Sequence, residues 1–158
     1  KDVADKKKEV TLLDLEALVG EEIREREDLF TLRSFVSQSG SAIIPTSQVE
    51  VEVRGRLRHG KSFSNGTVES VFKAIDNAVG MKGSLADYQV RAISEGKDAL
   101  AEVRVAVTVD GETYNGQAVS FDVMEASAKA DVRAMNNAAG AQGRERLQAR
   151  AATTAKGQ

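Results

Sequence analysis

The sequence predicts an α+β fold in which two pseudo-symmetric units, each of three strands and one helix (βββα), pack together after a short linker helix. Apolar residues alternate with polar ones at residues 49–57 and 103–109, and they recur every three to four residues further along each half. This order of patterns occurs twice, which indicates an internal duplication. A chain of 158 residues with 41% hydrophobic residues is long enough to bury one core.

The composition excludes several classes of chemistry. The chain has no cysteine, so it has no disulfide, thiolate zinc site or cysteine nucleophile. A single histidine, His59, argues against a multi-histidine metal site. The formal net charge of −2 gives no basic field for nucleic acid or for an anionic membrane. Neither a signal peptide nor a long apolar run opens the chain, so we expect a soluble cytoplasmic protein.

The first 28 residues hold six basic and ten acidic side chains and are the acidic part of the chain. From about Thr11 their apolar residues recur at three- and four-residue steps, which predicts a short amphipathic helix. Such a helix cannot bury its apolar stripe alone. We therefore assign residues 1–28 as a linker or a fragment of a helical subdomain.

The first repeat is predicted from residue 29 onward. Residues 29–40 predict a strand, and the alternation at residues 49–58 predicts one long half-buried strand. We expect the dipeptide His59-Gly60 to form the turn that follows. A helix is predicted over residues 68–79, and Gly80 is placed to end it.

The second repeat follows the same order. Strands are predicted at residues 85–94, 103–109 and 113–119, and Asp110-Gly111 is the hairpin signal between the last two. Asp122 is predicted to cap a helix that runs to about Ala138.

The remaining residues, 141–158, contain few large apolar side chains and are mildly basic. This composition fits either a frayed helical extension or a disordered end. We assign these residues as a flexible tail, which leaves residues 29–140 as the domain that carries both repeats.

The two repeats also align residue by residue. Two copies of one unit usually pack about a pseudo-two-fold axis, because neither buries its apolar face alone. The matched positions are His59-Gly60 with Asp110-Gly111, Phe63 with Tyr114, and Glu69, Lys73 and Ala74 with Glu125, Lys129 and Ala130.

A family resemblance rests on motifs in both repeats. These motifs are Asn65-Gly66-Thr67-Val68, Phe72-Lys73-Ala74-Ile75-Asp76, Leu85-Ala86-Asp87-Tyr88, and the stretches at residues 95–103 and 122–130. In this order and spacing they resemble the C-terminal regulatory domain of 2-isopropylmalate synthases and of the related citramalate synthases. The resemblance covers roughly residues 3–138.

The resemblance implies that residues 29–140 form an allosteric regulatory and dimerisation domain. It implies a parent enzyme that condenses acetyl-CoA with 2-oxoisovalerate in a metal-dependent TIM barrel, which this chain lacks. The chain is therefore expected to have no catalytic residues, no metal ligands and no cofactor of its own, with the divalent metal in the missing barrel. The implied partners are a second copy of the chain and a branched-chain amino acid, leucine or, in citramalate synthases, isoleucine.

An amino-acid effector needs N–H donors for its carboxylate, an acceptor for its ammonium group and a small apolar pocket. The N-termini of the two predicted helices can supply N–H donors and a positive dipole end. The resemblance places the effector pocket at Val68, Glu69, Leu85, Tyr88, Ala92, Ala99 and Val123. Adding the helix starts gives the candidate effector-binding residues Asn65, Gly66, Val68, Glu69, Leu85, Tyr88, Ala92, Ala99, Asp122 and Val123.

Each candidate also has a purely structural interpretation. Val68 and Val123 can be core residues in a first helical turn, and Tyr88 can be a packing residue. Asn65-Gly66 is a common turn sequence. Glu69 has a lysine four residues later, which is typical of a solvated ion pair.

The sequence departs from the family pattern at three places. Relatives have a Gly-Asx-Gly-Pro loop where this chain has Ser64-Asn65-Gly66-Thr67, so one glycine and the proline are missing. Phe121 replaces a common threonine. Asp131 replaces a tyrosine, and since a buried unpaired carboxylate is costly, we expect it either to face solvent or to alter an interface.

Two other functions stay open at this point. The chain can be a structural dimerisation module that has lost its effector, an alternative that Ser64, Thr67 and Phe121 favour. A stand-alone enzyme is the weaker alternative, because no nucleophile–base pair, metal cluster or phosphate loop can be assembled from these motifs.

Overall fold

The computed structural model describes residues 29–94 and 99–156 of the chain. The predicted linker helix lies outside these residues. The first unit contains β1 (Phe30–Gly40), β2 (Ile43–Val53), β3 (Arg56–Phe63) and α2 (Thr67–Val79), and the second contains β4 (Ser84–Ala92), β5 (Ala101–Val109), β6 (Glu112–Ser120) and α3 (Val123–Lys156). Two antiparallel three-stranded sheets, β1-β2-β3 and β4-β5-β6, are each followed by a helix, which confirms the α+β prediction of two βββα units.

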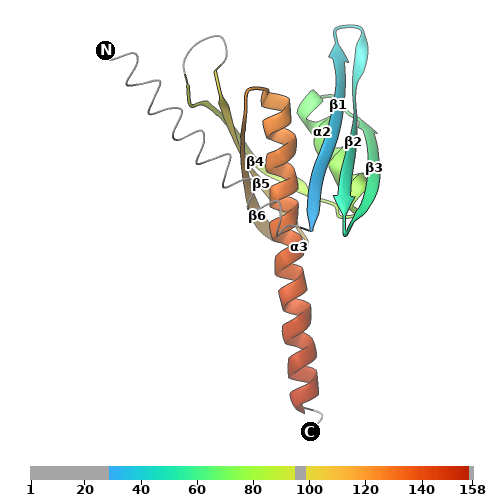
Figure 1. The fold of residues 1–158 in the computed structure, drawn as a ribbon, viewed down its shortest axis with the longest axis vertical. Helices are drawn as coiled ribbons and strands as arrows, with labels where there is room; N and C mark the ends of the chain where they lie inside the picture. The colour runs from blue at the N-terminus through green and yellow to red at the C-terminus, as the bar shows by residue number, and fades with distance from the viewer. Residues whose placement is uncertain (1–28, 95–98, 157–158) are drawn as a thin grey trace, which may run out of the picture.

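The two helices lie between the two sheets and share one core with them (Figure 1). Val49 and Val51 of β2 and alternate valines of β5 point toward the helices and are buried. The first half of α3 is buried on almost all sides, because β5, β6, α2 and β1 all pack against it. The opposite face of each sheet carries mainly polar side chains, as the alternation predicted.

One glycine in each sheet lets its helix approach closely. A Cβ on Gly60 of β3 would lie 1.9 Å from the carbonyl oxygen of Ala74, and a Cβ on Gly116 of β6 would lie 1.9 Å from that of Ala130. Neither helix could pack at this distance if either glycine carried a side chain. Gly60 and Gly116 are therefore equivalent positions of the two repeats.

The first hairpin turn lies earlier than predicted. Arg54 and Gly55 make the turn between β2 and β3, with φ of 52° and 79°, and His59 and Gly60 lie inside β3. Asp110 and Gly111 make the same turn in the second repeat, with φ of 51° and 82°.

The predicted alignment of His59-Gly60 with Asp110-Gly111, and of Phe63 with Tyr114, is therefore wrong. Arg54-Gly55 is the true counterpart of Asp110-Gly111. The turn was missed because arginine is uncommon in the left-handed conformation that this position requires, so the apolar alternation read as one strand.

The helix α2 begins and ends close to the predicted positions. Its C-cap is Gly80, which has the left-handed φ of 75° and donates to the carbonyl oxygen of Asp76 at 2.9 Å. The helix α3 begins after Asp122 and continues to Lys156, so residues 141–156 extend the helix beyond the globular part of the molecule (Figure 1).

One side chain joins the second repeat to the edge of the first. The amide of Asn136 on α3 accepts from the backbone N–H of Phe30 at 2.7 Å and donates to its carbonyl oxygen at 2.8 Å. Asn136 thus satisfies the backbone N–H and carbonyl groups of Phe30, at the sheet edge where β1 begins. No helix in the described part of the chain is both long and apolar enough to span a membrane.

Candidate functional site

The two helices begin at the same end of the molecule (Figure 1). Tyr88 of β4 joins their second turns. Its hydroxyl lies 2.6 Å from the Ser127 hydroxyl on α3, and its ring meets the edge of Phe72 on α2 with a centroid distance of 6.2 Å. One predicted site residue therefore contacts both helices near the end where a zwitterion was expected to bind.

The N-terminus of α2 has no side-chain cap. Its N-cap is Gly66, with an extended backbone at φ −128° and ψ 148°, and no side chain there accepts from the first turn. A Cβ at Gly66 would meet no atom within 4 Å, so the approach to this end of the helix is open. The first-turn N–H groups are therefore accessible to a carboxylate.

The N-terminus of α3 is capped by its own chain. Oδ1 of Asp122 accepts from the backbone N–H of Met124 at 2.8 Å and of Glu125 at 3.5 Å. The sequence predicted N–H donors at both helix starts, but at α3 the Asp122 carboxylate already occupies two of them. The two helix N-termini therefore offer complementary groups. The start of α2 has free N–H donors, and the start of α3 carries the negative charge of Asp122.

The first-turn glutamates are held on the helix surfaces. Glu69 and Glu125 form ion pairs with Lys73 and Lys129, each at 3.2 Å. A hydrogen bond from the Ser64 hydroxyl, followed by the hydrogen bond and charge of Lys73, lowers the pKa of Glu69. Both helices therefore carry the solvated ion pair expected from the sequence.

The candidate residues of β4 do not all lie together. Leu85 pairs with Val107 near the start of the strand, whereas Ala92 pairs with Ala101 at its end. Seven residues of strand span roughly 23 Å, which is far longer than an amino acid. Ala92, and Ala99 just before β5, lie at the end where α3 begins, so the structure groups them with Val123 and leaves Leu85 apart.

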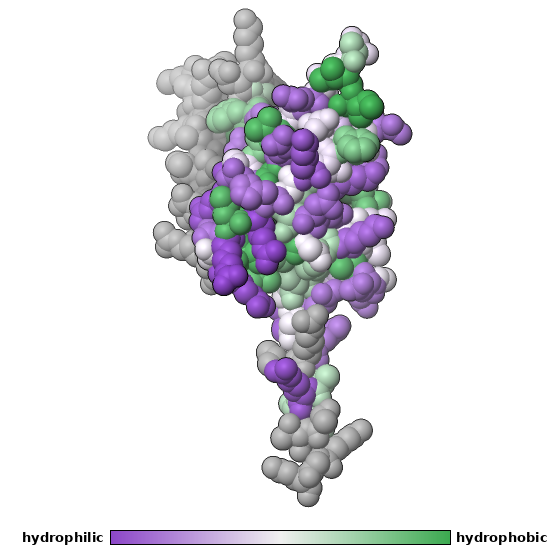
Figure 2. Space-filling view, turned by 90° about the vertical axis from the view of Figure 1, so that its right-hand side faces the viewer, coloured by the Kyte–Doolittle hydropathy of each residue, from purple (hydrophilic) through white to green (hydrophobic). Residues whose placement is uncertain are grey.

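The apolar candidates differ in burial. Val68 is half-buried and packs against the core, whereas Val123 is 40% exposed. Asn65 and Asp122 are exposed, and Phe121, beside Asp122, is 70% exposed. Figure 2 shows further hydrophobic side chains at this end, where Ile43, Ile44 and Phe63 are exposed on the first sheet. The surface around the helix starts is thus rich in uncovered apolar groups.

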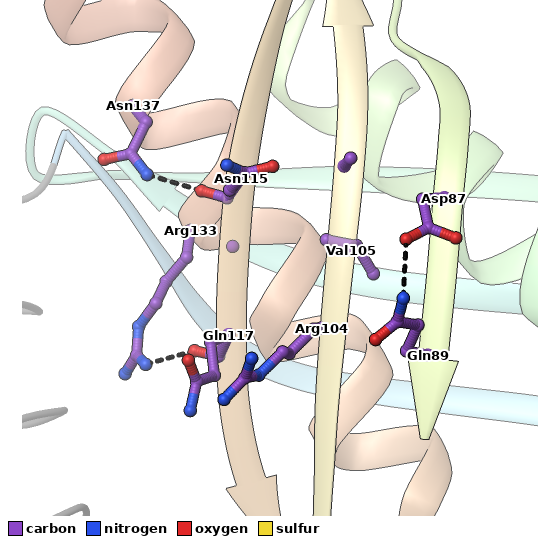
Figure 3. Close-up of a pocket in the computed structure, with 10 residues that line it drawn as sticks. Asp87, Gln89, Arg104, Val105, Asn115, Gln117, Arg133 and Asn137 are labelled. Atoms are coloured by element: carbon purple, nitrogen blue, oxygen red, sulfur yellow. Dashed lines mark hydrogen bonds between the residues drawn. The ribbon is translucent and has the colours of Figure 1, made fainter. Parts of the chain in front are cut away.

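A polar hollow that the sequence analysis did not predict lies on the outer face of the second sheet (Figure 3). It has a volume of about 780 Å³ and contains none of the candidate effector residues. The outward-facing polar residues of the alternating strands were the only signal for it. The residues that line it include Asp87, Gln89, Arg104, Asn115, Gln117, Arg133 and Asn137.

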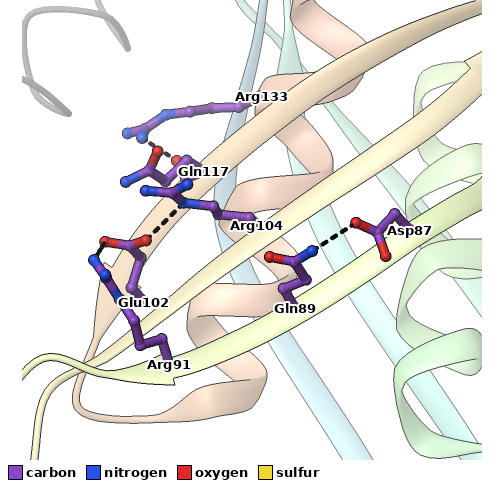
Figure 4. A network of polar contacts seen from close by, with 7 residues as sticks. All are labelled: Asp87, Gln89, Arg91, Glu102, Arg104, Gln117 and Arg133. Atoms are coloured by element: carbon purple, nitrogen blue, oxygen red, sulfur yellow. Dashed lines mark hydrogen bonds and ion pairs between the residues drawn. The ribbon is translucent and has the colours of Figure 1, made fainter.

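Several of these polar groups stabilise the sheet. Glu102 of β5 is buried and forms ion pairs with Arg91 at 3.1 Å and Arg104 at 2.7 Å (Figure 4). Arg133 of α3 donates to the carbonyl oxygen of Gln117, and Asn137 donates to that of Asn115 at 2.6 Å. The last two contacts occupy the free edge of β6.

Asp131 does not face solvent, which was one of the two expectations for it. Its side chain is 1% exposed, and its Oδ2 has no hydrogen-bond partner. Burial, and then the nearby Asp76 carboxylate on α2, raises the pKa of Asp131 well above its usual value. Burial also raises the pKa of Asp76 to about 6, although that carboxylate accepts from the backbone N–H of Gly83 at 3.3 Å.

These features define a duplicated βββα domain in which an uncapped helix start and the Asp122 carboxylate lie at the same end of the molecule. Residues 9–139 match the family described as the LeuA allosteric (dimerisation) domain, and the chain belongs to that family.

Similar proteins include the 2-isopropylmalate synthases of Pelotomaculum thermopropionicum and Dictyoglomus turgidum, each 42% identical over 137 residues, and that of Aquifex aeolicus, 41% identical over 140 residues. The matches cover 86%, 86% and 87% of this chain. The chain spans 27% of the length of each of these relatives.

Proposed function

We propose that this chain is the regulatory and dimerisation domain of a 2-isopropylmalate synthase and that it binds leucine for feedback inhibition. The names of the relatives and the family support the regulatory and dimerising role. The observation that carries effector binding is the uncapped start of α2, which lies at the same end of the molecule as Asp122 and the Tyr88 bridge.

The two helix starts provide complementary groups for an amino acid. The effector carboxylate would accept from the first-turn N–H groups of α2, where the helix dipole also favours negative charge. The ammonium group of the effector would lie near the Asp122 carboxylate. This carboxylate keeps its negative charge when it accepts the hydrogen bond that caps α3. The aliphatic side chain would pack against Val68, Val123 and the small residues Ala92 and Ala99.

Regulation requires that the effector binds one arrangement of the whole enzyme more tightly than the other. Tyr88 contacts both helices, so an effector between their starts would alter how α2 and α3 pack. We propose that a homodimer of this domain transmits the change to the catalytic barrel of the same cytoplasmic protein.

We propose that acetyl-CoA and 2-oxoisovalerate are condensed in that barrel and that this chain alone has no transferase activity. In the described residues no three His, Asp or Glu side chains come together as a metal site. The donor set of this part of the chain therefore does not fit the divalent metal that the family resemblance implies, and we place that metal in the barrel.

A single substitution tests the proposed carboxylate site. In the Gly66→Asp variant the new side chain can cap α2 as Asp122 caps α3, because a Cβ at Gly66 meets no atom and the backbone there is extended. We expect this variant to be more stable by about 0.3 kcal/mol and to bind leucine at least about tenfold more weakly by calorimetry.

The Gly66→Ala variant is the matched control, since it adds a Cβ without a competing carboxylate. It should keep most of the leucine affinity. Equal leucine affinity in the wild type and the Gly66→Asp variant would show that the start of α2 is not the carboxylate site.

Two alternatives are separated by the same titration. Tighter binding of isoleucine than of leucine would indicate a citramalate synthase domain. Binding of neither amino acid would indicate a structural dimerisation module, an alternative that the exposed Phe121 beside the start of α3 favours. Light scattering on the same samples measures the dimer independently of the effector.

A further inference from the structure

A second cavity lies at the opposite end of the helices from the proposed effector site. It has a volume of about 610 Å³ and is bounded by the start of β3, the end of α2 and the middle of α3. Its apolar wall is formed by Leu29, Phe30, Val53, Val79 and Met81. Three arginines, Arg54, Arg56 and Arg58, and the α3 residues Ala139, Gln142 and Gly143 also line it, and none of these described lining residues is acidic.

The three arginines are arranged on one side of the hairpin. Arg56 pairs with Val53 and Arg58 with Val51, so both share the face of the sheet that carries the core valines. Within the described residues, none of the ion pairs involves Arg54, Arg56 or Arg58. All three side chains are exposed, so an anion in solution can reach their guanidinium groups.

The backbone of Arg54 is a second, independent observation. Its φ of 52° lies in the left-handed region, which is unfavourable for a residue with a long side chain. The equivalent position in the second repeat holds Asp110, a residue that tolerates this conformation. An arginine at this turn is thus not explained by the turn itself.

The equivalent cavity of the second repeat has the opposite charge. It has a volume of about 400 Å³, and its lining includes Asp110, Glu112 and Tyr114 at the positions of Arg54, Arg56 and Arg58. Glu145 of α3 adds a further acid. The duplicated scaffold has therefore produced one basic and one acidic cavity on the two sides of α3.

We propose that the basic cavity binds an organic anion, a carboxylate or phosphate group attached to an apolar body. The guanidinium groups would bind the anion through paired N–H donors, and the apolar body would cover Phe30, Val79 and Met81. The acidic cavity would reject the same ligand. This inference does not rest on the proposed leucine site, which lies at the other end of α2.

An NMR titration of the full chain tests the proposal with four probes: hexanoate, hexyl phosphate, hexylammonium and inorganic phosphate. Gly55 and Gly143 report on the basic cavity, and Gly111 reports on the acidic one. We expect hexanoate and hexyl phosphate to shift the Gly55 and Gly143 amides and to leave Gly111 unchanged. Whichever of the two anions binds more tightly identifies the preferred head group.

Comparison of the probes tests both halves of the site. Hexylammonium should not shift Gly55, and inorganic phosphate should bind at least about tenfold more weakly than hexyl phosphate because it has no apolar body. Equal effects of hexanoate and hexylammonium at Gly55 would overturn the role of charge. Equal affinities of the two phosphates would overturn the role of the apolar wall.

The double variant Arg56→Gln/Arg58→Gln should bind hexanoate about tenfold more weakly. Both side chains are exposed, so the variant should keep the wild-type fold, which circular dichroism checks. Arg33→Gln is the matched control, since Arg33 is an exposed arginine of the same sheet outside the cavity. Unchanged hexanoate affinity in the double variant, or an equal loss in the control, would contradict the proposal.

Discussion

At the scale of single residues, the buried Asp131 is the position where this chain departs most from what burial favours. Its counterpart in the first repeat, aligned through Ala74 and Ala130, is the buried apolar Ile75. A carboxyl group with an unpartnered oxygen between two helices favours its neutral form, because burial removes the water that would stabilise the charged form. The nearby Asp76 adds repulsion to the same effect.

This arrangement predicts a stability that falls as the pH rises. In the folded chain the pKa of Asp131 lies well above 3.8 and that of Asp76 is about 6, so folding keeps protons that the unfolded chain releases. The stabilisation is complete below about pH 4 and is lost as the pH rises through the folded pKa values.

We expect Asp131→Asn to flatten this dependence and to raise the melting temperature at pH 8 by about 2–4 °C. Thermal unfolding between pH 5 and pH 8 measures both effects. Asp87→Asn, at an exposed aspartate of β4, is the control and should leave the profile unchanged. A wild-type melting temperature that rises steadily from pH 5 to pH 8 would refute this account of Asp131.

At the scale of elements, one glycine in each sheet sets how closely the helix packs against that sheet. Gly116→Ala would place a Cβ 1.9 Å from the Ala130 carbonyl oxygen and 2.7 Å from the Ala134 nitrogen, both backbone atoms of α3. Such atoms cannot move without shifting the helix. We expect a loss of at least about 3 kcal/mol in the free energy of unfolding, measured with urea.

Gly140→Ala is the control for this loss, because its Cβ would meet only an arginine side-chain atom at 3.9 Å. In the middle of α3 it should stabilise the chain by about 0.5–1 kcal/mol. Equal stabilities of the two variants would mean that Gly116 does not set the distance between helix and sheet.

The elements also show what could be predicted from the sequence. Strict alternation and three-to-four spacing were sufficient for β5, β6 and α2, whose ends lie within about two residues of the predictions. The hairpin at Arg54 was missed because its turn chemistry is unusual. The helix α3 was predicted to end near Ala138, which is wrong, because residues 141–156 lack the apolar spacing that marks a packed helix but are helical.

The candidate site was less predictable than the fold. That both helices begin at one end follows from the duplication. That Asp122 blocks the donors of α3 while α2 stays open depends on side-chain geometry. The separation of Leu85 from Ala92 follows from the length of β4. The opposite charges of the basic and the acidic cavity are recognised only when the two repeats are aligned through Arg54 and Asp110.

At the scale of the whole molecule, stability should reside in the layered part and not in the helical extension. Burial along α3 ends near Ala138, and the described side chains beyond Gly143 are exposed. We expect a chain that ends at Glu145 to keep its melting temperature within about 2 °C, as measured by calorimetry. A much larger drop would show that the extension packs against another part of the protein.

Asn136 has a consequence for the independence of the two repeats. Its amide accepts from the backbone N–H of Phe30 and donates to the Phe30 carbonyl oxygen, so a side chain of the second repeat satisfies the backbone of the first residue of β1. During synthesis of the chain, the backbone of Phe30 therefore gains this partner only after the second half has emerged.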